Sequence, residues 1–124
     1  MAAGSWLAVG GGAALGAWVR WGLGIALNAS ILPLGTLIAN LGGGLLMGMA
    51  MAYFMNTAAD NTLKLLIMTG FLGGLTTFSA FSAEAFNFLQ KQQYAWAASH
   101  ILSHVVGSLL MTAIGFMLVQ YFRN

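Results

Sequence analysis

Hydrophobic residues along this chain gather in four long runs, and short polar stretches with turn residues separate them. The runs extend over residues 6–27, 34–55, 63–90 and 95–122. A helix needs about 20 mostly apolar residues to cross a bilayer. The pattern therefore predicts an all-α membrane protein with four transmembrane helices, in which residues 1–124 form one domain and both termini lie on the same side.

The third run differs from an ordinary spanning helix between Gly70 and Glu84. Three glycines and four hydroxyl side chains fall in this stretch, and a carboxylate ends it. Irregular backbone at membrane depth persists only against protein or a watery cavity, because lipid offers no hydrogen-bond partner. We therefore expect the third helix to be broken in mid-membrane, with the hydroxyls of Thr76 and Thr77 bonding to freed carbonyls. A polar break of this kind is a candidate permeant site.

The composition excludes a soluble protein. Hydrophobic residues make up 60% of the chain and charged residues 5%, with a mean hydropathy of +0.85, whereas a soluble domain is about 25% charged. The net charge of +2 is too small and scattered for nucleic-acid binding. There is no cysteine and no phosphate-binding loop, and the few titratable residues do not surround a nucleophile. We expect neither an enzyme nor a nucleotide-driven pump.

The four basic residues divide evenly between the two expected sides of the membrane. Lys64 and Arg123 fall on the side of the termini, and Arg20 and Lys91 fall on the opposite side. An excess of basic residues in cytoplasmic loops normally sets the orientation. A chain without this bias can insert both ways and assemble as an antiparallel dimer. The alternative is that Arg20 is buried and does not count, which leaves a weak bias.

Glycines recur four residues apart in each of the first three runs. The pairs are Gly12 with Gly16, Gly44 with Gly48, and Gly70 with Gly74. Small residues at this spacing let helix backbones approach closely in lipid, so we expect them to serve packing. Helices packed this closely leave little space for an internal pore, and a pore would need a second subunit.

Isolated polar residues in the spans admit more than one interpretation. Arg20 either snorkels toward the interface or attracts anions. Asn40 either bonds to a neighbouring helix or donates its amide to a passing anion. In the fourth run His100, His104, Ser108 and Thr112 recur every four residues and share one helical face. The histidine spacing suits a metal, but no third ligand accompanies the pair as in a zinc-protease motif, so we do not expect a metal there.

Aromatic and hydroxyl side chains alternate after the expected break. Phe78 and Phe81 share one face, and Ser79 and Ser82 share the adjacent one. Phenyl rings have a positive edge, and together with hydroxyl donors they suit a small, strongly hydrated anion without trapping it. Helix packing or lipid contact is the alternative for the two rings. Carbonyls released at Gly73 and Thr76 would suit a small hard cation.

With these motifs the chain resembles the Fluc (CrcB) family of fluoride channels along nearly its whole length. Gly16-Ala-Trp-Val-Arg20-Trp21 is similar to the signature of the first span, and Gly35-Thr-Leu-Ile-Ala-Asn40-Leu-Gly-Gly-Gly44 is similar to that of the second. The most specific match is Gly73-Gly-Leu-Thr-Thr-Phe-Ser-Ala-Phe-Ser82 with Glu84, which resembles the broken third helix. In the fourth span His104, Gly107 and Ser108 fit.

The resemblance implies an antiparallel, dual-topology homodimer with two fluoride pathways in the inner (plasma) membrane of a bacterium. The protein would export cytoplasmic fluoride passively and confer fluoride resistance, with fluoride, membrane lipid and its own second copy as partners. A structural sodium ion would lie at the dimer interface, held by the backbone carbonyls of Gly73 and Thr76 from both subunits.

The resemblance also assigns side chains to the fluoride pathway. Asn40 would contact fluoride, Phe78 and Phe81 would supply a phenyl box, and Arg20 would lie at the mouth. The polar track beside the box would contain Ser79, Ser82 and Ser108. Ala80 stands where many members have Ser or Thr, and this missing hydroxyl predicts lower throughput.

Two rival functions make different demands on the sequence. A small multidrug transporter is also a four-span, dual-topology dimer, but it needs an embedded carboxylate in the first span, where this chain has Arg20. Glu84, within the third span, is read either as a structural acid or as a site of proton coupling. A structural or assembly protein without a permeant would tolerate changes at Phe78 or Asn40 without any effect on transport.

Overall fold

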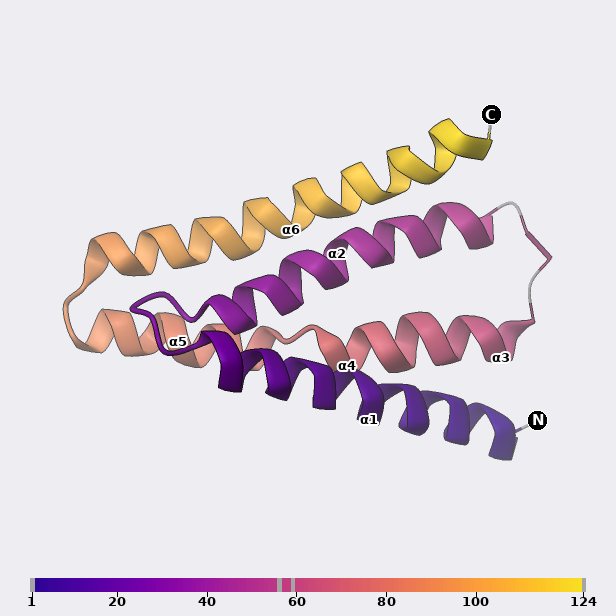
Figure 1. Cartoon of the computed structure of the whole chain (residues 1–124), viewed down its shortest axis with the longest axis horizontal. Coiled ribbons are helices and arrows are strands. Elements are labelled where there is room, and N and C mark those ends of the chain that lie inside the picture. The colour runs from indigo at the N-terminus through magenta and orange to yellow at the C-terminus, as the bar shows by residue number, and fades with distance from the viewer. Residues whose placement is uncertain (1, 56, 59, 124) are drawn as a thin grey trace.

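The computed structural model describes residues 2–55, 57–58 and 60–123, and all regular structure in these ranges is helical. The elements in chain order are α1 (Ala2–Leu27), α2 (Leu34–Met55), α3 (Asn61–Lys64), η1 (Leu65–Leu72), α4 (Gly73–Leu75), α5 (Phe78–Gln90) and α6 (Tyr94–Arg123). Figure 1 shows α3, η1, α4 and α5 following one another along one line. The start of α1 and the end of α6 lie at the same end of the molecule. The expected all-α class is confirmed.

Within the described ranges, three helical segments are long and apolar enough to cross a membrane. They are Leu34–Met55, Asn61–Gln90 and Tyr94–Arg123. Large apolar side chains cover the outside of the fold, for example Trp6 at 78% exposed, Trp21 at 69% and Phe122 at 80%. In water such a surface would cost about 25 cal/mol for each Å². The outer surface therefore suits lipid or a second protein chain.

Glycines let two pairs of helices approach backbone to backbone. α1 packs on η1 and α4, and α2 packs on α6. A Cβ atom added at Gly16 would lie 2.6 Å from the backbone nitrogen of Leu75, and one added at Gly48 would lie 2.8 Å from that of Phe116. Real Cβ atoms do not tolerate distances below 3.0 Å. The packing role predicted for these small residues is confirmed.

Two residues of extended backbone separate α4 from α5. Thr76 has φ −88° and ψ 154°, and Thr77 has φ −149° and ψ 126°. The hydroxyl of Thr76 donates to the carbonyl of Leu72 at 2.8 Å, and the hydroxyl oxygen of Thr77 accepts the N–H of Ala80 at 3.0 Å. Thr77 is thus the N-cap of α5. The segment before this point, η1, is wound as a π-helix, an irregularity that is frequent near functional sites.

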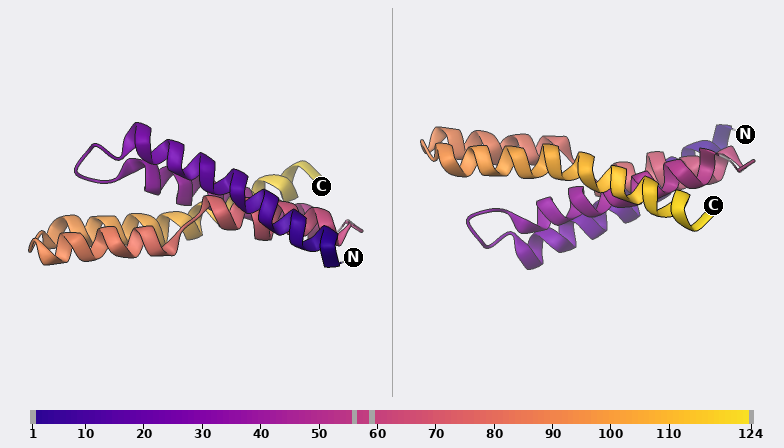
Figure 2. Two further views of the ribbon diagram at one scale, coloured as in Figure 1. Left: turned by 90° about the horizontal axis from the view of Figure 1, so that it is seen from below. Right: turned by 90° about the horizontal axis from the view of Figure 1, so that it is seen from above.

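The hairpin of α1 and α2 diverges from the hairpin of α5 and α6 toward their turns, as both views in Figure 2 show. A chain of hydrogen bonds connects the two hairpins near their turns. The Oδ1 atom of Asn28 accepts the N–H of Gly35 at 2.7 Å, and its Nδ2 lies 3.3 Å from the hydroxyl of Thr36. That hydroxyl donates to Oε2 of Glu84 on α5 at 2.7 Å. The bridge fixes α5 relative to α2 beside the extended pair.

Candidate functional site

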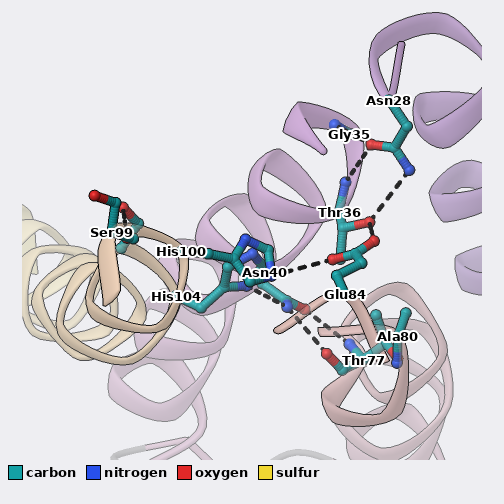
Figure 3. Close-up of polar contacts among 11 residues, drawn as sticks. Asn28, Gly35, Thr36, Asn40, Thr77, Ala80, Glu84, Ser99, His100 and His104 are labelled. Atoms are coloured by element: carbon teal, nitrogen blue, oxygen red, sulfur yellow. Dashed lines mark hydrogen bonds and ion pairs between the residues drawn. The ribbon is translucent and has the colours of Figure 1, made fainter. Parts of the chain in front are cut away.

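Asn40 holds the extended pair in place from the middle of α2. Its Oδ1 accepts the N–H of Thr77 at 2.8 Å, and its Nδ2 donates to the carbonyl of the same residue at 3.0 Å. This pairing fixes which end of the amide is oxygen and which is nitrogen. The second Nδ2 hydrogen points to Nδ1 of His104 on α6, at 2.9 Å. Figure 3 shows Asn40 between the histidines and Thr77. The amide therefore satisfies the broken backbone and ties three elements together.

A cavity of about 330 Å³ lies beside this amide, between α2, α5 and α6. Both phenylalanines of the expected box line it, with ring centroids 5.4 Å apart and planes at 66°. Phe81 is 7% exposed and stacks on the rings of His100 and His104, whereas Phe78 is 75% exposed. No charged side chain is among the described residues that line the cavity. Its polar groups are the amide of Asn40, the imidazole of His104 and the hydroxyls of Thr76, Thr77, Ser108 and Thr112.

The structure brings together only some of the residues that the sequence predicts for the pathway. Asn40, Phe78, Phe81 and Ser108 line the same cavity, and Thr76 and Thr77 join them. Ser79 is exposed, with its hydroxyl 3.4 Å from that of Thr77. Ser82 is half-buried elsewhere on α5.

Arg20 lies apart from the phenyl cavity. Its Nε donates to the carbonyl of Gly74 at 3.1 Å, which satisfies a carbonyl that the end of α4 leaves free. Its side chain lines a second cavity of about 390 Å³ with Thr36 and Glu84. Cation and carboxylate thus share one compartment next to α5.

The carbonyls of Gly73 and Thr76 lose their usual helical donors. In a continuous α-helix the N–H of Thr77 would serve Gly73, and the N–H of Ala80 would serve Thr76. Here the first N–H goes to Asn40 and the second goes to the hydroxyl of Thr77. Two carbonyl oxygens are thereby released within one turn of the interruption. Released carbonyls are the donor type that a small hard cation prefers, so these residues fit a sodium ion.

Sequence reasoning missed the part that His104 and the backbone of Thr77 play around Asn40. His104 is 4% exposed and supplies the acceptor for the second amide hydrogen. The signal for this role in the sequence was the position of His104 among the polar residues that recur every four positions in the fourth run. The partner across the helices is not readable from spacing alone, because it depends on how α6 lies against α2.

Fold and cavity together define a multi-pass helical membrane protein with an uncharged, mainly apolar cavity beside the extended residues Thr76 and Thr77. The model of the family described as "CrcB-like protein, Camphor Resistance (CrcB)" matches residues 7–116. The chain belongs to the CrcB family.

Several relatives are named "Fluoride-specific ion channel FluC". The one from Aromatoleum aromaticum is 56% identical over 123 residues, which is 97% of this chain and 94% of the relative. Those from Nitrosospira multiformis and Acinetobacter baylyi are 54% and 45% identical, covering 92% and 94% of this chain and 91% and 94% of the relatives. These names are those of an ion channel rather than an enzyme, which agrees with the expectation from the sequence.

Proposed function

We propose that this protein is a fluoride-selective channel that exports cytoplasmic fluoride by passive, electrogenic conduction and so confers fluoride resistance on a bacterium. The observation that carries the proposal is the cavity that Asn40, Ser108, Phe78 and Phe81 line together. The relatives named fluoride-specific channels supply the permeant.

The proposed assembly is an antiparallel homodimer of four-span subunits in the inner membrane. α1 is the fourth span, and Asn61–Gln90 crosses as one helix interrupted at Thr76 and Thr77. The even division of basic residues between the two sides supports dual insertion. The 75% exposure of Phe78 supports a second subunit that completes the cavity, and two such cavities would give two pores in the dimer.

In the proposed pathway Arg20 attracts fluoride at the mouth, and the phenyl edges receive it in the cavity. A cavity without a fixed positive charge admits an anion but does not trap it. Both Nδ2 hydrogens of Asn40 are engaged, by Thr77 and by His104. An arriving fluoride therefore replaces one of these two acceptors at Asn40, and the polar track of Ser79, Ser82 and Ser108 carries it onward.

A structural sodium ion would be held by the carbonyls of Gly73 and Thr76 of both subunits. The diversion of their helical donors to Asn40 and Thr77 supports this assignment. The ion would stabilise the interruption and join the subunits where they meet.

Fluoride release from liposomes that contain the purified protein tests the proposal. With valinomycin carrying potassium, we expect fluoride to leave rapidly while chloride in parallel vesicles is retained. Without valinomycin the release should stop, because an electrogenic flux needs a counter-ion. Equal release of the two halides, or none from a well-folded protein, would contradict the proposal.

A further inference from the structure

Three buried polar atoms without a hydrogen-bond partner converge between α5 and α6, and two of them are in ion-pair contact at 3.3 Å. They are Oε1 of Glu84 and the Nε2 atoms of His100 and His104, and they are the buried side-chain atoms without a hydrogen-bond partner among the described residues. His100 and His104 are 2% and 4% exposed. One ligand atom from each of the three residues lies within 4.8 Å of the others. A convergence of unpaired buried groups requires an explanation, because such groups are normally satisfied.

The donor set favours a divalent transition metal over an anion or a hard cation. Two imidazoles and one carboxylate are typical zinc ligands, and the carboxylate would repel an anion. Nε2 of His100 lies 3.3 Å from Oε1 of Glu84. Two ligands about 2.0–2.1 Å from a tetrahedral metal are themselves about 3.3 Å apart. The sequence of α6 supplies only the two histidines. The third ligand is Glu84 on α5.

The surroundings hold these ligands in one arrangement. His100 and His104 lie one turn apart on α6, and Phe81 stacks on both rings at centroid distances of 5.3 Å and 4.7 Å. The hydroxyl of Thr36 bonds to Oε2 of Glu84 at 2.7 Å, which leaves Oε1 for a metal. Hydrogen bonds of this kind orient carboxylate ligands in metal sites. Figure 3 shows the two histidines and Glu84 facing one another.

Two cavities reach Glu84, and one of them lies at the turn between α5 and α6. A cavity of about 310 Å³ reaches Glu84 from there, and Lys91 lines it. The larger cavity with Arg20 reaches Glu84 from the other hairpin. Each cavity is lined by one basic residue, so like charge slows the approach of a dication to Glu84.

Metal binding at His104 competes with its hydrogen bond to Asn40. Because Thr77 fixes the amide, Nδ1 of His104 accepts a hydrogen, and the imidazole proton lies on Nε2. If a metal binds Nε2 of His104, this proton must move to Nδ1 of the same ring. There it would face the Nδ2 hydrogens of Asn40, and the hydrogen bond would be lost. The bound state and the Asn40–His104 hydrogen bond therefore exclude each other.

We propose that Glu84, His100 and His104 bind a divalent ion of the Zn²⁺ class. Its binding frees one Nδ2 hydrogen of Asn40 and places a fixed positive charge beside the cavity that His104 lines, so fluoride is held there and its flux falls. Metal binding does not depend on the proposed function of the protein, whereas the effect on fluoride flux rests on it.

Cobalt(II) is the probe for the binding step, because four-coordinate cobalt has a strong visible absorption that zinc abolishes by displacement. We expect the purified full-length protein to take up stoichiometric cobalt with this spectrum. His100→Gln and Glu84→Gln should each weaken the apparent affinity by at least ~10-fold. Asp60→Asn, which removes the other acidic side chain at an exposed turn, is the matched control and should bind as wild type. Cobalt binding that is absent, or equal in wild type and both ligand variants, would overturn the site.

Fluoride release with and without zinc tests the second step. We expect zinc to reduce release through the wild type at least ~10-fold, and through His100→Gln by less than ~2-fold, in line with the loss of metal affinity. If cobalt binds but zinc does not inhibit release, the proposed effect on flux is wrong and the metal site still holds. Absence of fluoride release before zinc is added would overturn the proposed function instead, and the cobalt spectra would still decide the metal site.

Discussion

Asn40→Asp is the substitution that tests the cavity most sharply. The carboxylate has the shape of the amide, but it replaces the NH₂ donor with a negatively charged acceptor. Oδ1 can still accept the N–H of Thr77, which lies at 2.8 Å. The other atom becomes an oxygen that faces the carbonyl of Thr77 at 3.0 Å and Nδ1 of His104 at 2.9 Å. His104 can relieve the second contact by moving its proton to Nδ1. The contact between the new oxygen and the carbonyl of Thr77 cannot be relieved in this way, and it costs about 1–3 kcal/mol of stability.

The added charge has a larger effect on fluoride than on the fold. A unit charge about 4 Å from an anion repels it by about 4 kcal/mol at an effective dielectric constant of 20. At 1.4 kcal/mol for each tenfold change, fluoride flux should fall roughly 10³-fold. The measurement is the initial rate of fluoride release from liposomes, with size-exclusion elution of the detergent-solubilised protein as the test of folding.

Asn61→Asp is the matched control for the same change of charge. Asn61 is exposed at the start of α3, where a carboxylate is favourable at a helix N-terminus. This variant should release fluoride at the wild-type rate. If Asn40→Asp folds and conducts within ~3-fold of wild type, the new carboxylate does not repel the permeant ion, and Asn40 does not face the fluoride pathway.

Two further substitutions, a labelling experiment and an ion replacement test other parts of the proposed channel. Phe81→Ile removes the ring edge and should abolish fluoride release in liposomes while the protein elutes normally; unchanged release would remove Phe81 from the pathway. Gly48→Val forces α2 away from α6, so thermal unfolding in detergent should show a loss of about 1–3 kcal/mol, whereas an unchanged transition would mean that the backbones do not meet there. A cysteine added at the C-terminus should label from both faces of intact membranes, and labelling from a single face would exclude dual insertion. Replacing sodium with N-methylglucamine should weaken the dimer and slow fluoride release, and indifference to sodium would argue against the carbonyl site.

The helical class could be predicted from the sequence because it follows from local properties. Runs of apolar residues set helix length, and glycine spacing set the backbone contacts that Gly16 and Gly48 make. The unusual stretch around Thr76 could also be recognised, since glycines and hydroxyls stand out within an apolar run. These signals need no knowledge of how the helices are arranged.

The contacts around the cavity could not be predicted in the same way. The bond between Asn40 and His104 joins residues 64 positions apart, and the bond between Thr36 and Glu84 joins residues 48 apart. Such pairings depend on the rotation and crossing of each helix. For the same reason the sequence of α6 offered two histidines without a third metal ligand, and Glu84 emerged only when α5 was placed beside them.

The central claim is that the conducted ion is fluoride, and a reversal potential in a planar bilayer tests it most directly. A tenfold fluoride gradient is imposed with an equal and opposite chloride gradient, and the cations are kept equal. We predict a current that reverses at the Nernst potential of fluoride, about 59 mV in magnitude. Reversal at the potential of opposite sign, which belongs to chloride, or at zero would contradict fluoride selectivity.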